Sequence, residues 1–206
     1  MYRLYWSPGA ASLAVHWMLL ELGVPFALER ADIDSGQNRS ADYLTVNPTG
    51  RVPTLIVDGA PVTETAALLM LLAERHPEAS LSPPVGSPAR AEWLQWMLWL
   101  ANTLQPPFRL WFYPDDLGGT DRDAVRAVIE DCFDHLDARL AGRRFMIGDS
   151  LTTADLLAAM LMRWSRNMPK PATAWPGLAA YLAHIRARPA LRELHVAEGL
   201  TDWIND

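Results

Sequence analysis

The chain has 206 residues, half of them hydrophobic, and a formal net charge of −6 at pH 7. This length suffices to bury one large hydrophobic core or two smaller ones, so one or two domains are possible. The acidic balance argues against sequence-independent binding to nucleic acid, because neutralising phosphates takes a clustered excess of Lys and Arg.

The cysteine content and the apolar stretches bear on where the protein works. The single cysteine, Cys132, cannot form an internal disulfide, and the N-terminus lacks a basic region followed by an apolar run and a cleavage site. The most apolar stretch, residues 92–108, is interrupted by Gln95, Asn102, Gln105 and two prolines well before bilayer length. We therefore expect a cytoplasmic protein without a membrane partner.

The first elements predict a β-α-β unit. Residues 3–6, RLYW, are short, apolar and aromatic, as in a buried strand, and an apolar helix follows over about 12–22. Gly23 can take the left-handed position after this helix, and Pro25 prevents its continuation. Residues 26–33 then alternate as a second strand would.

The next elements complete a small α/β domain. Residues 41–50 predict a short helix and a turn, and residues 54–63 predict a hairpin. Its Asp58-Gly59 pair supplies the positive φ angles of a tight turn. Residues 64–77 predict a closing helix, which gives the order β-α-β-α-β-β-α.

A proline-rich segment separates this domain from a helical one. Residues 80–88 carry three prolines and one glycine, which neither a helix nor a central strand tolerates. We expect an α/β domain at 1–79, a linker at 80–88 and an all-helical domain at 89–206. The helical periods fall at about 89–105, 121–140 and 153–166, with a last helix after Pro176.

Two helix starts in the second half have the spacing of a capping box. Thr120 with Asp123, and Thr152 with Asp155, stand at the N-cap to N3 spacing, with Asp in place of the usual Glu. We expect each pair to satisfy the free N–H groups at its helix start.

The turn after the first strand is the first candidate site. It carries neither the G-x-G-x-x-G of a dinucleotide fold nor the C-x-x-C of a disulfide oxidoreductase, and Ser7 stands where a redox protein has its nucleophilic sulfur. A ligand can bring its own sulfur instead. Gly9, Ala10 and Ala11 leave the backbone open, and Ser12 would sit at a helix N-terminus, which favours an anion.

Holding a thiol as thiolate at pH 7 requires lowering its pKa by about two units, roughly 2.7 kcal/mol. One hydroxyl donor and a helix terminus could supply that free energy. The alternative interpretation is that Ser12 is an ordinary N-cap.

Two further stretches are candidate binding segments. In GRVPTL, residues 50–55, a cis peptide at Pro53 would turn the N–H and C=O of Val52 outward to pair with an extended peptide; the alternative is a trans proline opening a strand. At the start of the next helix, Thr65 and free N–H groups suit the carboxylate of an amino acid, and Glu64 suits its ammonium group. The alternative is that Thr65 caps the helix and Glu64 interacts with its dipole.

In order and spacing these stretches resemble a glutathione S-transferase from end to end. The resemblance is carried by YWSPGAASL, NPTGRVPTL, the ET pair before a helix, the proline-rich linker and GDSLTTADLLAAMLMRW. It is closest to bacterial beta-class enzymes, which share an S/T-P-G turn and an ARP near the end, as in RARPAL. The resemblance implies a thioredoxin-like N-terminal domain followed by an all-α domain.

The resemblance also implies which residues hold glutathione. Val52 and a cis Pro53 would hold its cysteinyl backbone, and Glu64 and Thr65 its γ-glutamyl end. The glutathione-binding residues expected in this way are Ala11, Ser12, Arg51, Val52, Pro53, Glu64 and Thr65.

The chain departs from beta-class enzymes at the turn, where their cysteine is replaced by Ala11. Mixed-disulfide chemistry through that cysteine is therefore not expected. The theta-like serine position falls on Ala10, and the catalytic tyrosine position of other classes falls on Tyr5. We rank Ser12 first as the group that activates the thiol, Tyr5 second and Ser7 third.

The remaining candidates are interpreted as structural. The histidines show no metal-ligand spacing and Cys132 fits a core position, so no metal is expected. Trp93, Trp96 and Trp99 recur on a helix that is apolar on more than one face, which indicates a subunit interface or the wall of an apolar pocket. The resemblance implies both uses, and with them a homodimer.

The sequence therefore predicts a glutathione transferase that uses glutathione as co-substrate and attacks a small apolar electrophile, held against the helical domain, with the thiolate. The resemblance places such enzymes in detoxification. Two alternatives stay open: a binding or scaffold protein of the same fold without turnover, and a glutathione-dependent isomerase or dehalogenase.

Overall fold

The computed structural model describes residues 1–117, 119 and 121–205, and contacts divide it into two compact units. The first unit comprises Met1–Ser80 with Arg188–Asp206, and the second comprises Leu81–Ala187. The division at Ser80 falls within the expected linker. The C-terminal segment differs from the expected boundaries, because it packs in the first unit instead of the helical one.

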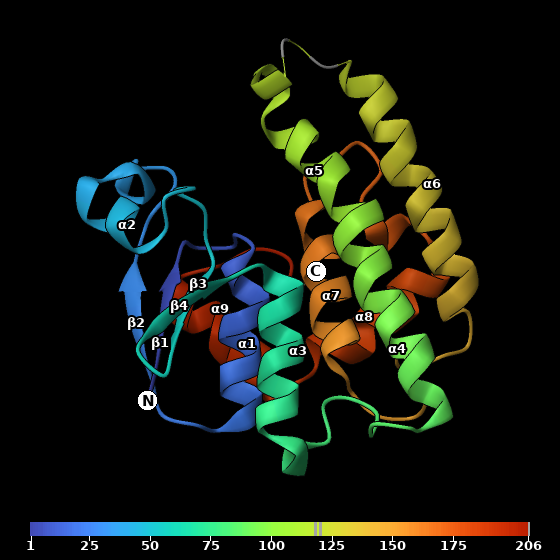
Figure 1. Ribbon diagram of the computed structural model, residues 1–206. Coiled ribbons are helices and arrows are strands. Elements are labelled where there is room, and N and C mark those ends of the chain that lie inside the picture. The colour runs from blue at the N-terminus through green and yellow to red at the C-terminus, as the bar shows by residue number, and fades with distance from the viewer. Residues whose placement is uncertain (118, 120, 206) are drawn as a thin grey trace. The chain divides into compact units, whose positions relative to one another are not determined.

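The sheet of the first unit is mixed and has four strands (Figure 1). The strands are β1 (Tyr2–Trp6), β2 (Phe26–Arg30), β3 (Thr54–Val57) and β4 (Ala60–Thr63), in the order β2-β1-β3-β4. β1 is parallel to β2 and antiparallel to β3, and β3 is antiparallel to β4. The parallel pair requires a crossover connection, which α1 (Ser12–Leu22) supplies.

Three more α-helices belong to this unit: α2 (Ala41–Val46), α3 (Thr65–Arg75) and α9 (Pro189–Glu198). Short 3-10 helices lie at Gln37–Arg39 and Pro77–Ala79. In Figure 1, α3 lies beside α1 and α9 lies behind it, and both helices contact α1. The order β-α-β-α-β-β-α expected for the N-terminal part of the chain is confirmed.

Helix α1 occupies the core of the first unit. Residues 12–19 are all buried, so the helix has no solvent-facing stripe over its first two turns. A helix covered on several sides needs apolar residues all round, which is why the segment after Ala11 is almost wholly apolar. Gly23 ends the helix in the left-handed conformation, with φ of +63°, as its sequence predicts.

In the described residues of the second unit, all regular secondary structure is helical. Its α-helices are α4 (Pro88–Trp99), α5 (Gln105–Phe112), α6 (Arg122–Leu140), α7 (Thr153–Trp164) and α8 (Pro176–Arg186), and 3-10 helices lie at Pro114–Leu117 and Ala172–Ala174. In α7, every residue from Thr153 to Arg163 is buried. This helix is therefore the core of the second unit.

Two expected helix boundaries are wrong. The helix expected to end near 105 continues to Phe112, because a π-helical segment at Leu100–Leu104 joins α4 to α5. The N–H of Gln105 there reaches the Leu100 carbonyl, and the following prolines occupy the first turn of α5, where a missing N–H costs little. The single helix expected after Pro176 is two, because Pro189 starts α9.

Of the two expected capping boxes, the one at α7 is confirmed. The Thr152 N–H donates to Asp155 Oδ2 at 2.8 Å. At α6, Thr120 lies outside the described residues, and the N-cap is Asp121, whose carboxylate accepts the N–H groups of Asp123 and Ala124. Asp123 therefore stands one position too early to complete the expected box.

Within the described ranges 1–117, 119 and 121–205, none of the helices combines the length and apolar character needed to cross a bilayer.

Candidate functional site

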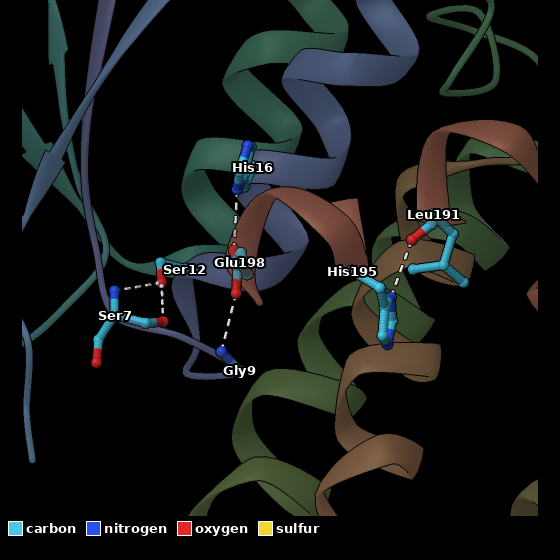
Figure 2. A network of polar contacts seen from close by, with 7 residues as sticks. All are labelled: Ser7, Gly9, Ser12, His16, Leu191, His195 and Glu198. Atoms are coloured by element: carbon cyan, nitrogen blue, oxygen red, sulfur yellow. Dashed lines mark hydrogen bonds and ion pairs between the residues drawn. The ribbon is translucent and has the colours of Figure 1, made fainter. Parts of the chain in front are cut away.

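The turn between β1 and α1, residues 7–12, is closed by its two serines (Figure 2). The N–H of Ser7 donates to Ser12 Oγ at 3.2 Å, and Ser12 Oγ donates to the Ser7 carbonyl, also at 3.2 Å. The Ala10 N–H shares that carbonyl at 3.2 Å. Ser12 is the first residue of α1 and is fully buried.

Ser12 does not cap its helix. The N-cap of α1 is Ala11, which has no side chain to accept a hydrogen bond. Among the hydrogen bonds of the described residues, none uses the N–H of Ala11 or Ser12, so both are free to bind a ligand. An open helix start of this kind favours an anion, since its N–H groups and its dipole point to the same place.

The peptide bond between Val52 and Pro53 is cis, so the trans alternative is wrong. No hydrogen bond to the Val52 N–H or C=O is found in the part of the chain that the structure describes. The neighbouring Arg51 carbonyl is held instead, since it accepts from Asn47 Nδ2 at 2.8 Å and from the Tyr43 hydroxyl at 2.6 Å. A fixed segment therefore presents an unpaired backbone edge at Val52.

The Tyr43 hydroxyl is protonated at neutral pH, as in an ordinary tyrosine, and donates to the Arg51 carbonyl; burial raises its pKa further. The Arg51 side chain itself is exposed.

The start of α3 contacts the turn. Thr65 is its first residue, is buried, and donates its hydroxyl to the Ala11 carbonyl at 3.2 Å. The preceding Glu64 has an exposed side chain and a φ of +71°, a conformation that costs a non-glycine residue about 1–3 kcal/mol and that clusters at binding sites. The alternative interpretation, in which Thr65 caps α3, is wrong, because the N-cap position belongs to Glu64.

The other two candidate hydroxyls lie on the strand side of the turn. Ser7 is buried, and its Oγ accepts the N–H of Ile33 at 3.1 Å. Tyr5 packs its ring 5.3 Å from that of Tyr43 and lines a cavity of about 260 Å³, together with Arg30, Gln37, Ser40, Asp42 and Val46.

The structure thus brings the predicted residues together in the first unit. Ser7, Ala11, Ser12 and Thr65 are joined by hydrogen bonds, and Tyr5 packs against the apolar cluster that contains Val52. Sequence reasoning missed Glu198, whose buried carboxylate accepts the Gly9 N–H. The sequence signal that could have found Glu198 is its place on a buried helix face, which is formed by Leu191, Leu194, His195 and Glu198 at helical spacing.

A search for metal sites within the described residues finds no group of three or more His, Cys, Asp and Glu side chains able to hold an ion.

Comparison with known proteins identifies relatives over the whole length. Residues 10–75 match the family model for the N-terminal domain of glutathione S-transferases, and residues 119–184 match the one for the C-terminal domain. Glutathione S-transferase GstA of Escherichia coli O157:H7 is 31% identical over 200 residues, which cover 96% of this chain and 99% of that protein.

Solved structures agree. A sphingomonad glutathione S-transferase complexed with glutathione is 33% identical, with a TM-score of 0.87 over 97% of this chain and 100% of that one. A bacterial beta-class glutathione S-transferase from Sphingomonas chungbukensis is 30% identical, with a TM-score of 0.85 over the same shares of the two chains.

Proposed function

Because the chain belongs to the glutathione S-transferase family, we propose that its first unit binds glutathione and that the thiolate attacks a small apolar electrophile. The observation that carries this proposal is the bond from Thr65 to the Ala11 carbonyl, which joins two helix starts at one place. Each start is suited to a negative group, and glutathione has both a carboxylate and a thiolate to offer.

Glutathione would lie along the fixed backbone edge at Val52. Its cysteinyl N–H and C=O would pair with the C=O and N–H of Val52, as an added strand would, with Pro53 and Arg51 flanking the contact. Its γ-glutamyl carboxylate would meet the start of α3 at Thr65, and its ammonium group would meet the exposed Glu64 carboxylate.

The sulfur would then lie at the start of α1, near Ala11 and Ser12. The Ser12 hydroxyl donates to the Ser7 carbonyl at 3.2 Å, longer than most O–H···O bonds, so exchanging that acceptor for a thiolate costs little. The Ser7 N–H polarises the same hydroxyl and strengthens it as a donor. Because Ser12 is buried, this exchange requires the turn to open slightly on binding.

Tyr5 is the second proposed donor and Ser7 the third. The Tyr5 ring lines a cavity, so its side chain is accessible to a small molecule. Ser7 is buried and already accepts the Ile33 N–H, although its own proton stays available.

The second unit offers apolar surface for a homodimer. Leu98 on α4 is 52% exposed and Val128 on α6 is 48% exposed, whereas Trp93 on the same α4 is fully buried. Such side chains on helix surfaces favour burial against a second copy. We propose a cytoplasmic homodimer that acts in detoxification, without a metal; sedimentation at micromolar concentration tests its oligomeric state.

Glutathione affinity by calorimetry, combined with turnover of an aryl halide, tests the proposed activity. Micromolar to millimolar binding with turnover supports it, and no binding would contradict it. Tight binding without turnover would favour the scaffold protein, an alternative supported by Ala10 and Ala11 at two positions where relatives of the family carry catalytic groups. Turnover of a substrate of a glutathione-dependent isomerase or dehalogenase, without turnover of the aryl halide, would favour the isomerase or dehalogenase alternative.

A further inference from the structure

Helix α9 is joined at one end to α1 and at the other to α1 and the turn that precedes it. Just before its first residue, the Arg188 guanidinium makes two hydrogen bonds to the Glu21 carboxylate, both 2.8 Å long. At its last residue, the Glu198 carboxylate reaches the turn before α1 (Figure 2). The same helix therefore makes one ion pair away from the candidate site and one polar contact within it.

Figure 2 shows Glu198 between α1 and the turn. Its Oε2 accepts the Gly9 N–H at 2.8 Å, and its Oε1 lies 2.9 Å from His16 Nδ1. The side chains of His16 and Glu198 are 1% and 0% exposed. A buried carboxylate has no water to replace a lost partner, so both contacts hold it firmly in one position.

The turn that Glu198 holds is also braced by the bonds from the Ala10 N–H to the Ser7 carbonyl and from the Thr65 hydroxyl to the Ala11 carbonyl, neither of which is made by Gly9. Between Ser7 and Ser12 it contains Pro8, Gly9 and two alanines, and none of these side chains can make a hydrogen bond. Gly9 has a φ of +65°, which a residue with a Cβ rarely adopts, and its N–H donates to Glu198 of α9. The Ser7–Ser12 contacts are longer, at 3.2 Å, than the charge-assisted one from Gly9.

We propose that Glu198 is a positioning residue for the reaction: held by His16, it fixes Gly9 and thereby the direction of the N–H groups of Ala11 and Ser12. This inference rests on the proposed function, which places the glutathione sulfur at those groups. Donors aimed at a developing or bound charge act through fixed positions, and small displacements reduce the rate severalfold or more. Among the hydrogen bonds of the described residues, those of the Glu198 side chain go to Gly9 and His16 and not to the backbone edge at Val52 or the start of α3, so glutathione binding should be largely preserved.

The test compares Glu198→Gln with Arg188→Met. Gln preserves the size of the side chain but removes its charge and replaces one of the two oxygens that contact Gly9 and His16 with an NH2 group, and Met removes the guanidinium at the other end of the same helix. With glutathione and an aryl halide, we expect Glu198→Gln to lower kcat about tenfold and to leave KM for glutathione within twofold. Arg188→Met should lower the melting temperature and leave both kinetic constants within twofold of the wild type.

A second readout needs no ligand. The Gly9 amide proton, bonded to a carboxylate, should resonate downfield and exchange slowly in the wild type and in Arg188→Met. In Glu198→Gln the resonance should shift upfield and exchange faster.

Several results would overturn the positioning role. Glu198→Gln that loses only thermal stability would make Glu198 structural, a raised KM alone would make it a binding residue, and a raised kcat would mean that its charge opposes the thiolate. An unchanged Gly9 resonance in Glu198→Gln would show that the Gly9 N–H does not donate to the Glu198 carboxylate. A wild type that binds no glutathione would refute the proposed function and the positioning role together, whatever the Gly9 resonance shows.

Discussion

The starts of α1 and α7 are both buried helix N-termini, but they differ in whether a side chain accepts hydrogen bonds at the helix start. At α7, the Asp155 carboxylate accepts from the backbone of Met146 and Thr152 and from the side chains of Thr152 and Tyr181. At α1, the N-cap is Ala11, and no acceptor for the N–H groups of Ala11 and Ser12 is found among the described residues. A helix start closed by its own chain contributes stability, whereas one left open can bind an anion.

The largest effect expected from this comparison is on stability. Asp155→Ala removes the common acceptor of four donor groups in a fully buried place, so we expect it to destabilise the fold by about 3 kcal/mol. Urea denaturation measures the change. Glutathione affinity of the folded fraction should equal that of the wild type, and unchanged stability would contradict the structural role of the box.

A second prediction concerns the start of α3. Glu64→Ala removes the proposed partner of the ligand's ammonium group, and it should weaken glutathione binding by about 2 kcal/mol, as for the loss of a charged hydrogen-bond partner. The matched control is Glu78→Ala, an exposed carboxylate beyond the other end of α3. Calorimetry that finds equal affinities for Glu64→Ala and the control would exclude the proposed contact.

The closed start should also respond to pH. Burial raises the pKa of Asp155 to about 6 in the folded protein, above its ordinary value near 3.8. The folded state therefore binds a proton more readily than the unfolded chain, so stability contributed by this group is present at low pH and is lost as pH rises through about 6.

Between pH 7 and pH 5, protonation of Asp155 should add about 1 kcal/mol to the free energy of unfolding. Because other groups titrate in the same range, the measurement is the difference between the wild type and Asp155→Asn, each unfolded with urea at several pH values. A difference that stays constant from pH 7 to pH 5 would refute the raised pKa.

The parts of the two helices that the sequence could predict are those determined by neighbouring residues. Gly23 and Pro25 ended α1 correctly, and the spacing of Thr152 and Asp155 gave the capping box at α7. These signals lie within a few residues of what they determine.

The contacts that the sequence could not predict are long in range or depend on competing neighbours. Glu198 and Gly9 are 189 positions apart, and nothing near either residue specifies the partner. Asp121 took the N-cap position of α6 because it stands next to the expected Thr120 and accepts equally well. The prolines after Gln105 did not end a helix, because the π-helical turn before them satisfied the backbone.

The direct test of the account is the pKa of the glutathione thiol bound at the open start of α1, read from thiolate ultraviolet absorbance against pH. Ser12→Ala removes one donor and leaves the contacts at Val52 and α3, so affinity should change little.

The thiol pKa in Ser12→Ala should rise by about one unit, which is 1.36 kcal/mol, and turnover at neutral pH should fall with it. Tyr5→Phe is the control and should leave the thiol pKa unchanged. A thiol pKa that shifts with Tyr5→Phe and not with Ser12→Ala would contradict the account and assign thiol activation to the tyrosine.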